Sequence, residues 1–291
     1  MHAAAIFGPN ACEKDLRPFQ RNSDATWHIG LPANPSDTDV VLIFGGDGTV
    51  HRYLPELVRL QLPALVVPCG SGNDFARALN LHSPGAALIV WKKFTSDGNN
   101  VRAIDLGVIA ALSEPAPREH YFCCVGGVGL DAEVARRANR LPRWLRAHGG
   151  YVISLASALF HLAPFPTKIS VRSPDDPEAF VAHSNQPTVV AAFANAPTYG
   201  SGMKIAPHAQ LDDGQLDLCV IRRIDPFKLF CLFPTIYFGK HLRMPEVEYL
   251  QTSRLRIETE LPLDVYADGE YVCKTPIEAS VARAALRVIA P

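Results

Sequence analysis

The sequence predicts an α/β fold in which a domain of alternating strands and helices precedes a β-rich domain. In residues 1–100, continuous apolar runs end at glycine-rich turns, and apolar residues at helical spacing follow those turns. Beyond about residue 100, short strand-like runs punctuated by Gly and Pro dominate. The length of 291 residues and the 48% hydrophobic content suit a globular chain of one large domain or two ordinary ones.

Apolar runs predict three strands in the first part of the chain: His2–Phe7, Val40–Phe44 and Ala64–Val67. Runs that are apolar throughout suit parallel strands buried on both faces of a sheet. Apolar residues at helical spacing follow the second strand. Because a proline cannot lie deep inside a helix, Pro55 predicts that this helix begins near Arg52 to Leu54. After the third strand, Asn73 is expected to cap a helix over Asp74–Leu79.

A polar, turn-rich segment at Lys92–Arg102 is the predicted domain junction, which gives domains at residues 1–100 and 101–291. Two helical segments are expected in the second domain, Tyr151–Leu162 and Pro226–Phe238. Its predicted strands are Val101–Ile109, His120–Val125, Lys168–Arg172, Thr188–Ala194, Leu216–Ile221, Arg254–Thr259, Leu263–Ala267 and two short ones at the end.

The composition argues against several classes of protein. A formal net charge of −1 supplies no positive excess for nucleic acid, whose binding depends largely on phosphate contacts. The N-terminus lacks the basic segment of a signal peptide, and no run approaches the roughly 18 apolar residues of a membrane span. The seven cysteines lack Cys-x-x-Cys spacing and are expected to be buried, reduced thiols. We therefore expect a soluble, cytoplasmic protein that binds no nucleic acid.

A glycine-rich loop lies between a predicted strand and a predicted helix and contains Gly45, Gly46, Asp47, Gly48 and Thr49. Glycines let backbone N–H groups approach an anion, and the helix that follows adds its positive N-terminal end. The threonine offers a hydroxyl donor, and the aspartate offers a carboxylate for magnesium or its water shell. The alternative is an ordinary tight turn between a strand and a helix.

A second loop of the same kind follows the next strand and contains Gly70, Ser71, Gly72, Asn73 and Asp74. The ends of adjacent parallel strands lie at one edge of a sheet, where ligands bind in such folds. One glycine loop is a weak signal, but two at neighbouring strand ends indicate a nucleotide or phosphate site.

The segments GGDGT at residues 45–49 and PCGSGNDFAR at residues 68–77 resemble the paired signature of the diacylglycerol kinase catalytic family. That family includes bacterial lipid kinases and is related to sphingosine and ceramide kinases. GGDGT alone is shared with NAD kinases, but later motifs separate the two and extend the resemblance over nearly the whole chain. These motifs are Ile104–Gly107, Gly127–Asp131, Asn195–Pro197, Gly202–Pro207, Leu211–Asp217 and Asp268–Glu270.

The resemblance implies a Rossmann-like N-terminal nucleotide domain and a C-terminal β-sandwich domain, as in NAD kinases and diacylglycerol kinases, with the active site in the cleft. It implies that ATP and Mg²⁺ bind along the two glycine loops, with Gly46 to Thr49 and Ser71 touching ATP. Asp74 would organise the nucleotide and metal, and Arg77 would brace its loop.

Two carboxylates near the C-terminus, Asp268 and Glu270, flank Gly269 between strand-like runs. From the residues alone, Asp-Gly is equally a favoured turn of a β-hairpin. The resemblance implies that both are catalytic, because this family has its catalytic carboxylates in Asp-Gly-Glu. A kinase positions a carboxylate to accept the proton of the attacking hydroxyl. Glu270 is the expected base, with Asp268 as its partner.

The segment Leu211–Asp217 resembles a metal loop of bacterial members of the family. By position, the side chain of Asp213 and the carbonyls of Gln210 and Gln215 would hold a structural Mg²⁺, which prefers hard oxygen ligands. A plain turn rich in aspartate is the alternative.

The segment Pro226–Phe238 is dense in large apolar residues and is flanked by Lys228, Lys240, His241 and Arg243. It is a candidate interfacial helix that contacts the membrane to collect a lipid substrate. The alternative is a helix packed on the β-rich domain. We expect transient peripheral contact with a membrane, and a homodimer stays open as the oligomeric state.

The resemblance implies a kinase of lipid metabolism that transfers the γ-phosphate of ATP to a lipid hydroxyl, such as that of diacylglycerol, in phospholipid biosynthesis. The family usually continues GGDGT with one residue and then Asn-Glu, whereas this chain has Val50, His51 and Arg52. A cation thus replaces a carboxylate. Two alternatives stay open: an NAD kinase-like enzyme acting on a small molecule, and a nucleotide- or lipid-binding homologue with impaired catalysis.

Overall fold

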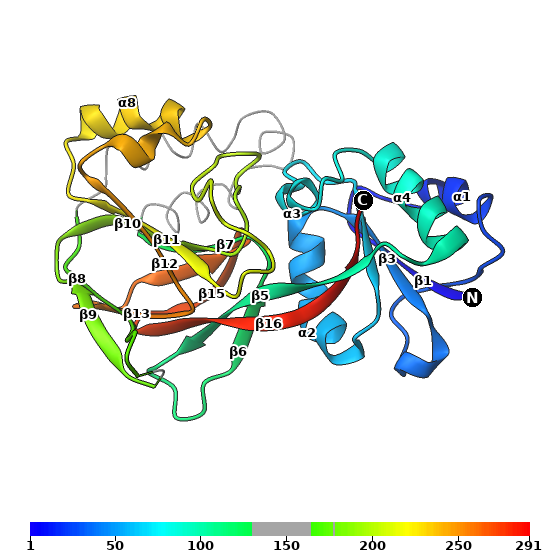
Figure 1. The fold of residues 1–291 in the computed structure, drawn as a ribbon, viewed down its shortest axis with the longest axis horizontal. Helices are drawn as coiled ribbons and strands as arrows, with labels where there is room; N and C mark the ends of the chain where they lie inside the picture. Colours follow the sequence, from blue (N-terminus) through cyan, green and yellow to red (C-terminus); the bar gives the residue numbers. More distant parts are fainter. Residues whose placement is uncertain (130–163, 177) are drawn as a thin grey trace. The chain divides into compact units, whose positions relative to one another are not determined.

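The computed structural model describes residues 1–129, 164–176 and 178–291, and the chain forms two compact units. Unit 1 contains Met1–Leu106 together with Arg283–Pro291, and unit 2 contains Gly107–Ala282. Figure 1 shows the elements of both. The C-terminal segment returns to the unit in which the chain begins, an arrangement that no local signal in the sequence indicates.

Unit 1 is built on a parallel sheet in the order β2-β1-β3-β4. Every residue of β3 is buried, as expected for a strand covered on both faces. The end of β16 (Ile277–Ile289) extends this sheet beside β4, where Val288 pairs with Ala64. The strands predicted from the three apolar runs are confirmed, and β2 is added to them: β1 (His2–Phe7), β2 (Thr26–Ile29), β3 (Val40–Gly45) and β4 (Ala64–Pro68).

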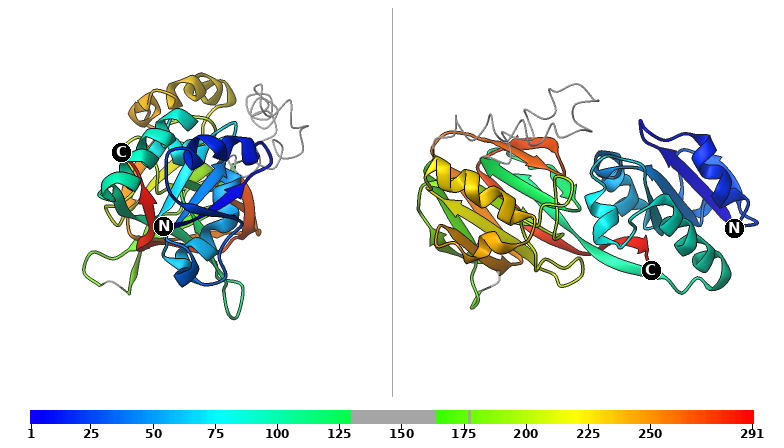
Figure 2. Two further views of the ribbon diagram at one scale, coloured as in Figure 1. Left: turned by 90° about the vertical axis from the view of Figure 1, so that its right-hand side faces the viewer. Right: turned by 90° about the horizontal axis from the view of Figure 1, so that it is seen from above.

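Helices cover both faces of the unit 1 sheet. Helices α1 and α4 lie on one face and α2 on the other (Figures 1 and 2), because right-handed crossovers run outward in opposite directions from the centre of the sheet. The buried Trp91 of α4 donates from Nε1 to the carbonyl of Phe19 in α1 at 3.2 Å. The helical elements are α1 (Glu13–Gln20), η1 (Pro35–Asp37), α2 (Asp47–Leu60), α3 (Asp74–Ala78) and α4 (Pro84–Asp97).

The predicted start of the second helix is wrong. Helix α2 begins at Asp47, not near Arg52 to Leu54, and it contains Pro55. The proline lies on the exposed side, where it removes one backbone hydrogen bond without disturbing the buried face. That face buries Val50, Leu54, Leu57 and Leu60, and its burial outweighs the local cost.

The polar segment Lys92–Arg102 is not turn throughout, because α4 continues through it to Asp97. The two lysines at its start are exposed, while Val90 and Trp91 on the opposite side are buried. The exposed side of an amphipathic helix end has the same polar composition as a loop, so composition alone does not distinguish the two.

Unit 2 contains two β-sheets that share one hydrophobic core, which confirms the predicted β-rich sandwich. One sheet has the order β12-β11-β10-β7-β14-β15, and the other joins β16, β13, β8 and β9 with β5 and β6. Phe122 and Phe193, one from each sheet, meet edge to face with ring centroids 5.7 Å apart. The strands are β5 (Val101–Ala111), β6 (Glu119–Phe122), β7 (Val125–Gly129), β8 (Thr167–Arg172), β9 (Phe180–Ser184), β10 (Thr188–Ala194), β11 (Leu216–Arg222), β12 (Val247–Thr252), β13 (Arg254–Thr259), β14 (Asp264–Ala267) and β15 (Glu270–Lys274).

The predicted strand His120–Val125 is two strands that belong to different sheets. The chain leaves β6 at Phe122 and enters β7 at Val125, and Cys123 and Cys124 form the break. The apolar run gave no sign of this, because the residues of the break are as buried as the strand residues on either side of it. The strand β16 is also longer than the short terminal strand expected, with 13 residues.

Two predicted features lie outside the described residues: the helix Tyr151–Leu162 and the motif residues Leu130-Asp131. The predicted helix Pro226–Phe238 is confirmed as α8 (Pro226–Ile236), which lies over the strands of unit 2 and is followed by η2 (Lys240–Arg243) (Figures 1 and 2). In the part of the chain that the structure describes, no helix has the length and hydropathy to cross a membrane.

The prediction that the cysteines are buried is only partly right. All seven are free thiols, and four of them, Cys123, Cys124, Cys219 and Cys273, are buried. Cys12 and Cys231 are exposed and Cys69 is half-buried; Cys12 and Cys69 lie in loops, and Cys231 lies in α8.

A buried carboxyl group lies within the strands of unit 2. Asp217 of β11 is fully buried and accepts a hydrogen bond of 2.5 Å from the hydroxyl of Tyr249 on β12. Burial raises the pKa of Asp217, and the hydrogen bonds from Tyr249 and Gln251 offset only part of this effect. The folded chain therefore retains the Asp217 proton to a higher pH than the unfolded chain does.

We expect Asp217→Asn to change how stability depends on pH. Because the pKa of Asp217 is raised on folding, its contribution is complete below the ordinary carboxyl pKa of about 3.9 and is lost as the pH rises through the raised value. The free energy of unfolding of Asp217→Asn should therefore rise relative to that of wild type as the pH increases from about 4 through the raised pKa of Asp217. Urea denaturation measures this, with the exposed Asp212→Asn as control. Parallel profiles for Asp217→Asn and wild type would contradict the assignment.

Candidate functional site

The two glycine loops of unit 1 lie in backbone contact. A Cβ atom added at Gly46 would lie 2.9 Å from the Cα of Gly70, and one added at Gly70 would lie 2.5 Å from the Cα of Gly46. Both loops leave the same edge of the sheet, because β3 and β4 are parallel neighbours with Gly45 paired to Pro68. Any side chain at either glycine would collide with the opposing backbone, so the contact requires glycine on both sides.

The carboxylate of Asp47 joins the two loops. Asp47 is the first residue of α2, and its oxygens accept the backbone N–H groups of Asp74 at 3.1 Å and Phe75 at 2.9 Å. These two residues begin α3, so Asp47 satisfies donors that a helix leaves unpaired at its N-terminus. Asp47, which was expected to offer its carboxylate to magnesium, thus positions the backbone of the second loop.

The prediction that the side chain of Asn73 caps α3 is wrong. Asn73 has a left-handed backbone with φ of 55°, and its side chain turns back to Gly70. Its Oδ1 accepts from the Gly70 N–H at 2.9 Å, and its Nδ2 donates to the Gly70 carbonyl at 2.7 Å. Asn73 therefore closes the second loop, and capping falls to Asp47. The sequence could not show this, because the capping partner is 27 residues away in the chain.

The expected bracing of the second loop by Arg77 is present. The Arg77 guanidinium lies 2.7 Å from Oδ1 of Asp74, whose side chain is almost completely buried. Gly48 in the first turn of α2 and Ser71 in the second loop, by contrast, are exposed. Burial raises the pKa of the Cys69 thiol at the start of the second loop, which favours a neutral group beside these residues.

A third turn meets the glycine loops, and the sequence had not assigned it to the site. A Cβ atom added at Gly8, at the end of β1, would lie 2.3 Å from Oγ1 of Thr49. The Gly8 N–H donates to the carbonyl of Phe44 at 2.8 Å. The signal that could have found Gly8 is its place directly after a buried strand, as Gly46 directly follows β3.

The arrangement in unit 1 suits an anion with several oxygens. Three turns converge at the carboxyl ends of β1, β3 and β4, where the 14-residue helix α2 begins. The first N–H groups of a helix have no intrahelical partner, and the helix dipole favours negative charge there. Phosphate groups are the ligands that such a helix start and glycine turns bind most readily in proteins.

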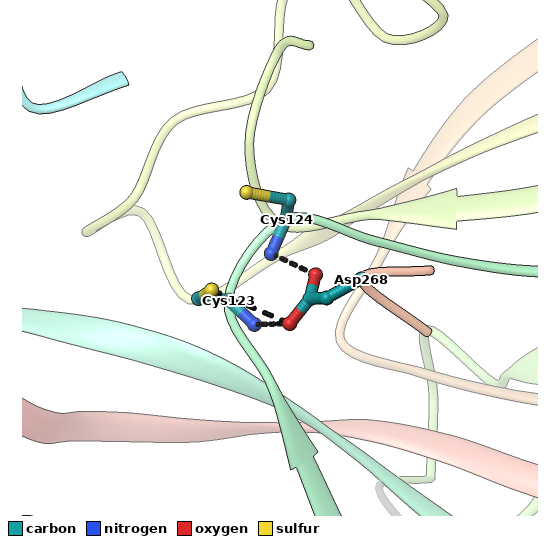
Figure 3. Close-up of side chains that lie close together, drawn as sticks. All are labelled: Cys123, Cys124 and Asp268. Carbon is teal, nitrogen blue, oxygen red and sulfur yellow. Dashed lines mark hydrogen bonds between the residues drawn. The ribbon is translucent and has the colours of Figure 1, made fainter. Parts of the chain in front are cut away.

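In unit 2, Asp268 is held by backbone N–H groups at the break between β6 and β7 (Figure 3). Its Oδ2 accepts from the N–H of Cys123 at 2.9 Å, and its Oδ1 accepts from the N–H groups of Cys124 at 2.8 Å and Val125 at 3.3 Å. The Cys123 thiol lies 3.3 Å from Oδ2. The carboxylate thus fixes both the strand break and its own turn.

Asp268 and Gly269 form a two-residue hairpin turn between β14 and β15, where Ala267 pairs with Glu270. Both turn residues have positive φ, 50° and 86°, as a type I′ turn requires. The hairpin interpretation of this motif is therefore confirmed. Glu270 follows the turn directly and is exposed, so its carboxylate is open to a ligand in a way that Asp268 is not.

The side chains of Cys123, Cys124 and Asp268 also offer three possible metal ligands within 4.8 Å of one another. Both oxygens of Asp268, however, already accept backbone N–H groups, so the protein itself supplies partners for this carboxylate. We interpret this cluster as a hydrogen-bonded anchor for the hairpin.

The predicted magnesium loop precedes β11. Oδ1 of Asp213 accepts the N–H of Gln215 at 2.9 Å across Gly214, which has a left-handed φ of 71°. Gln210 is exposed and Gln215 half-buried. One carboxylate and two backbone carbonyls make a donor set of hard oxygens only, which fits Mg²⁺. The turn expected as the alternative is also present, since the carboxylate closes it.

Two buried motif residues have structural partners that the sequence did not reveal. Asp105 accepts the N–H of Ala284 at 2.7 Å and so fixes the returning C-terminal strand, in which Ala284 has a positive φ. Asn195 donates from Nδ2 to the carbonyl of Cys123 at 3.2 Å and supports the same strand break as Asp268. The only signal in the sequence was that Asp105 and Asn195 are polar residues of the motifs Ile104–Gly107 and Asn195–Pro197.

Comparison with known proteins gives matches along both parts of the chain. Residues 3–109 match the diacylglycerol kinase catalytic domain, and residues 125–290 match the YegS C-terminal NAD kinase beta sandwich-like domain. A diacylglycerol kinase of Mycobacterium tuberculosis is 34% identical over 267 residues, which cover 91% of this chain and 81% of that protein. A probable lipid kinase YegS-like of Chromohalobacter salexigens is 28% identical over 286 residues, with 91% and 82% covered.

Solved structures show the same fold. A putative diacylglycerol kinase from Bacillus anthracis has a TM-score of 0.71 at 20% identity, covering 100% of this chain and 97% of that one. An NAD kinase from Archaeoglobus fulgidus in complex with ATP has a TM-score of 0.55 at 14% identity, covering 99% and 93%. With both domain types matched in order and a relative at 34% identity, the chain belongs to the diacylglycerol kinase family of lipid kinases.

Proposed function

We propose that the protein is an ATP-dependent lipid kinase that phosphorylates a hydroxyl group of a lipid such as diacylglycerol. The observation that carries this proposal is the pair of glycine loops in backbone contact beside the start of α2. Membership of the diacylglycerol kinase family supports a nucleotide as the anion, and the relatives named as diacylglycerol or lipid kinases support a lipid as the acceptor.

The glycine loops would bind the phosphates of ATP. Phosphoryl transfer depends mainly on positioning and on stabilising charge, so fixed backbone N–H groups do much of the work. Gly46 to Thr49 and Ser71 would contact ATP, while Asp47 and Asn73 hold the loops in shape. Mg²⁺ bound with ATP would neutralise phosphate charge. Asp213, with the carbonyls of Gln210 and Gln215, would hold a separate structural Mg²⁺.

Glu270 would accept the proton of the lipid hydroxyl. It is exposed at the start of β15, and the turn before it is fixed. Asp268 would act as a positioning residue, because three backbone N–H groups bind its carboxylate and set the turn that presents Glu270. A base held in one place loses little entropy on reaching the transition state.

The acceptor is tested by incubating the purified protein with ATP labelled in the γ-phosphate. One set of reactions contains diacylglycerol or a total lipid extract, and a second contains NAD. We expect label in the lipid fraction only. Label in NAD alone would favour a small-molecule kinase. ATP binding without transfer to either acceptor would favour an impaired homologue, for which Arg52 in place of a carboxylate is the motivation.

We predict that Gly70→Ala weakens ATP binding by about tenfold or more. Its Cβ would collide with the backbone of Gly46, and overpacking of this kind costs about 1–3 kcal/mol. Calorimetric titration with Mg-ATP measures the effect. Gly85→Ala is the matched control, because its Cβ meets nothing closer than Oγ of Ser83 at 3.7 Å. Equal ATP affinity in the two variants would show that the glycine contact does not shape the site.

We predict that Glu270→Gln lowers kcat by about 10²–10⁴-fold, the usual contribution of a positioned base, and leaves ATP affinity and thermal stability unchanged. Asp268→Asn should lower both kcat and the melting temperature, because its amide N–H₂ would face backbone donors. The exposed Glu260→Gln is the control for a surface carboxylate. Wild-type turnover in Glu270→Gln would leave the motif with its hairpin role alone.

A further inference from the structure

Helix α8 presents phenylalanines to solvent where a surface helix usually presents polar side chains. Phe227 and Phe230 of α8 are 74% and 59% exposed, and Phe238, just beyond its end, is 73% exposed. The strongly exposed phenylalanines of the described residues all lie in this segment. A cluster of exposed large apolar side chains is typical of a surface that binds a protein, a membrane or a ligand.

The other side of α8 already provides the contact with unit 2. Leu229, Leu232 and Ile236 are buried, and their spacing of three and four residues places them on one face. Phe227 and Phe230 also lie three residues apart, on a different face. The exposed phenylalanines are therefore not a core face that failed to pack, because α8 has its core face elsewhere.

Helix α8 is capped at its N-terminus and attached to a distant segment at its C-terminal end. Asp225 caps α8 by accepting the N–H groups of Phe227 at 2.9 Å and Lys228 at 3.3 Å. The carbonyl of Ile236 accepts from the N–H of Lys204 at 3.2 Å. The buried His241 in η2 donates from Nε2 to the carbonyl of Ile205 at 3.1 Å. With these bonds in place, α8 cannot turn its phenylalanines inward without breaking its attachment.

The charged side chains within the segment that carries the phenylalanines, residues 227–243, are all basic. Lys228, Lys240 and Arg243 are exposed, and no Asp or Glu occurs from Phe227 to Arg243. Lys240 lies 5.9 Å from the ring centroid of Phe238. Lys228 contacts Glu246 at 3.0 Å, so its charge is partly compensated, and Lys240 and Arg243 supply most of the basic character.

We propose that the outer face of α8, defined by Phe227, Phe230 and Phe238, inserts into a membrane surface that contains anionic phospholipid. A helix that lies in the plane of the interface buries aromatic side chains among the acyl chains and places cations at the lipid phosphates. Lys240 lies close to the exposed ring of Phe238. Leu229, Leu232 and Ile236, on another face of α8, are buried. The binding does not depend on which acceptor the enzyme phosphorylates.

The test measures co-sedimentation of the full chain with vesicles, without ATP. Wild type should bind vesicles of phosphatidylcholine with phosphatidylglycerol, and bind less to phosphatidylcholine alone or at high salt. The triple variant Phe227→Ser, Phe230→Ser, Phe238→Ser should bind about tenfold or more weakly, because its apolar anchors are gone. Lys240→Gln with Arg243→Gln should lose the preference for anionic vesicles.

The matched controls are Ile89→Ser and Leu261→Ser, which remove apolar side chains that are 70% and 73% exposed elsewhere. Both should bind vesicles as wild type does. Unchanged melting temperature and ATP affinity of the triple variant would show that it is folded. Vesicle binding of the triple variant equal to wild type would overturn the proposal. So would a wild type that ignores vesicles but forms a dimer that the triple variant loses, since the face would then bind a second copy.

Discussion

The glycine loops of unit 1 depend on one close approach, the contact between the backbones of Gly46 and Gly70 that Asp47 holds in place. Because the contact joins the ends of two buried parallel strands, the geometry of the loops follows from the sheet. The unusual Arg52 is exposed on α2, and the contact between Gly46 and Gly70 is made by backbone atoms. The departure from the family pattern therefore leaves the backbone of the loops intact.

Carboxylates of the polar motifs serve the backbone in both units. Asp47 binds the start of α3, Asp105 binds the returning strand at Ala284, and Asp268 binds the break between β6 and β7. An ionised carboxylate accepts several N–H groups strongly, so one aspartate can fix two distant segments. Glu270 differs from these three because it is exposed. This difference separates a residue that holds the turn from one that can act on a substrate.

Much of the fold was predictable, since buried strands such as Val40–Gly45 and Thr188–Ala194 are apolar throughout and end at glycine or polar turns. The errors occurred where distant contacts override the local pattern. The apolar run His120–Val125 divides between two sheets because Asp268 binds the backbone at Cys123 and Cys124. The sequence did not predict edge strands such as β9. Most residues of β9 are exposed and need not be apolar, so no apolar run marks the strand.

The sequence by itself determined the two glycine loops, the Asp-Gly-Glu turn and the apolar helix near residue 230, because glycine spacing, turn chemistry and periodicity are local properties. Only the tertiary structure decided which partner each motif residue has. Asp47 caps the helix that Asn73 was expected to cap, and Asp268 binds the backbone N–H groups at a strand break far away in the chain. It also decided which face of α8 is buried, because the outward position of Phe227 and Phe230 depends on strands far away in the chain. Hydrogen bonds and burial between distant segments are set by how the strands pair, and no short stretch of sequence contains that information.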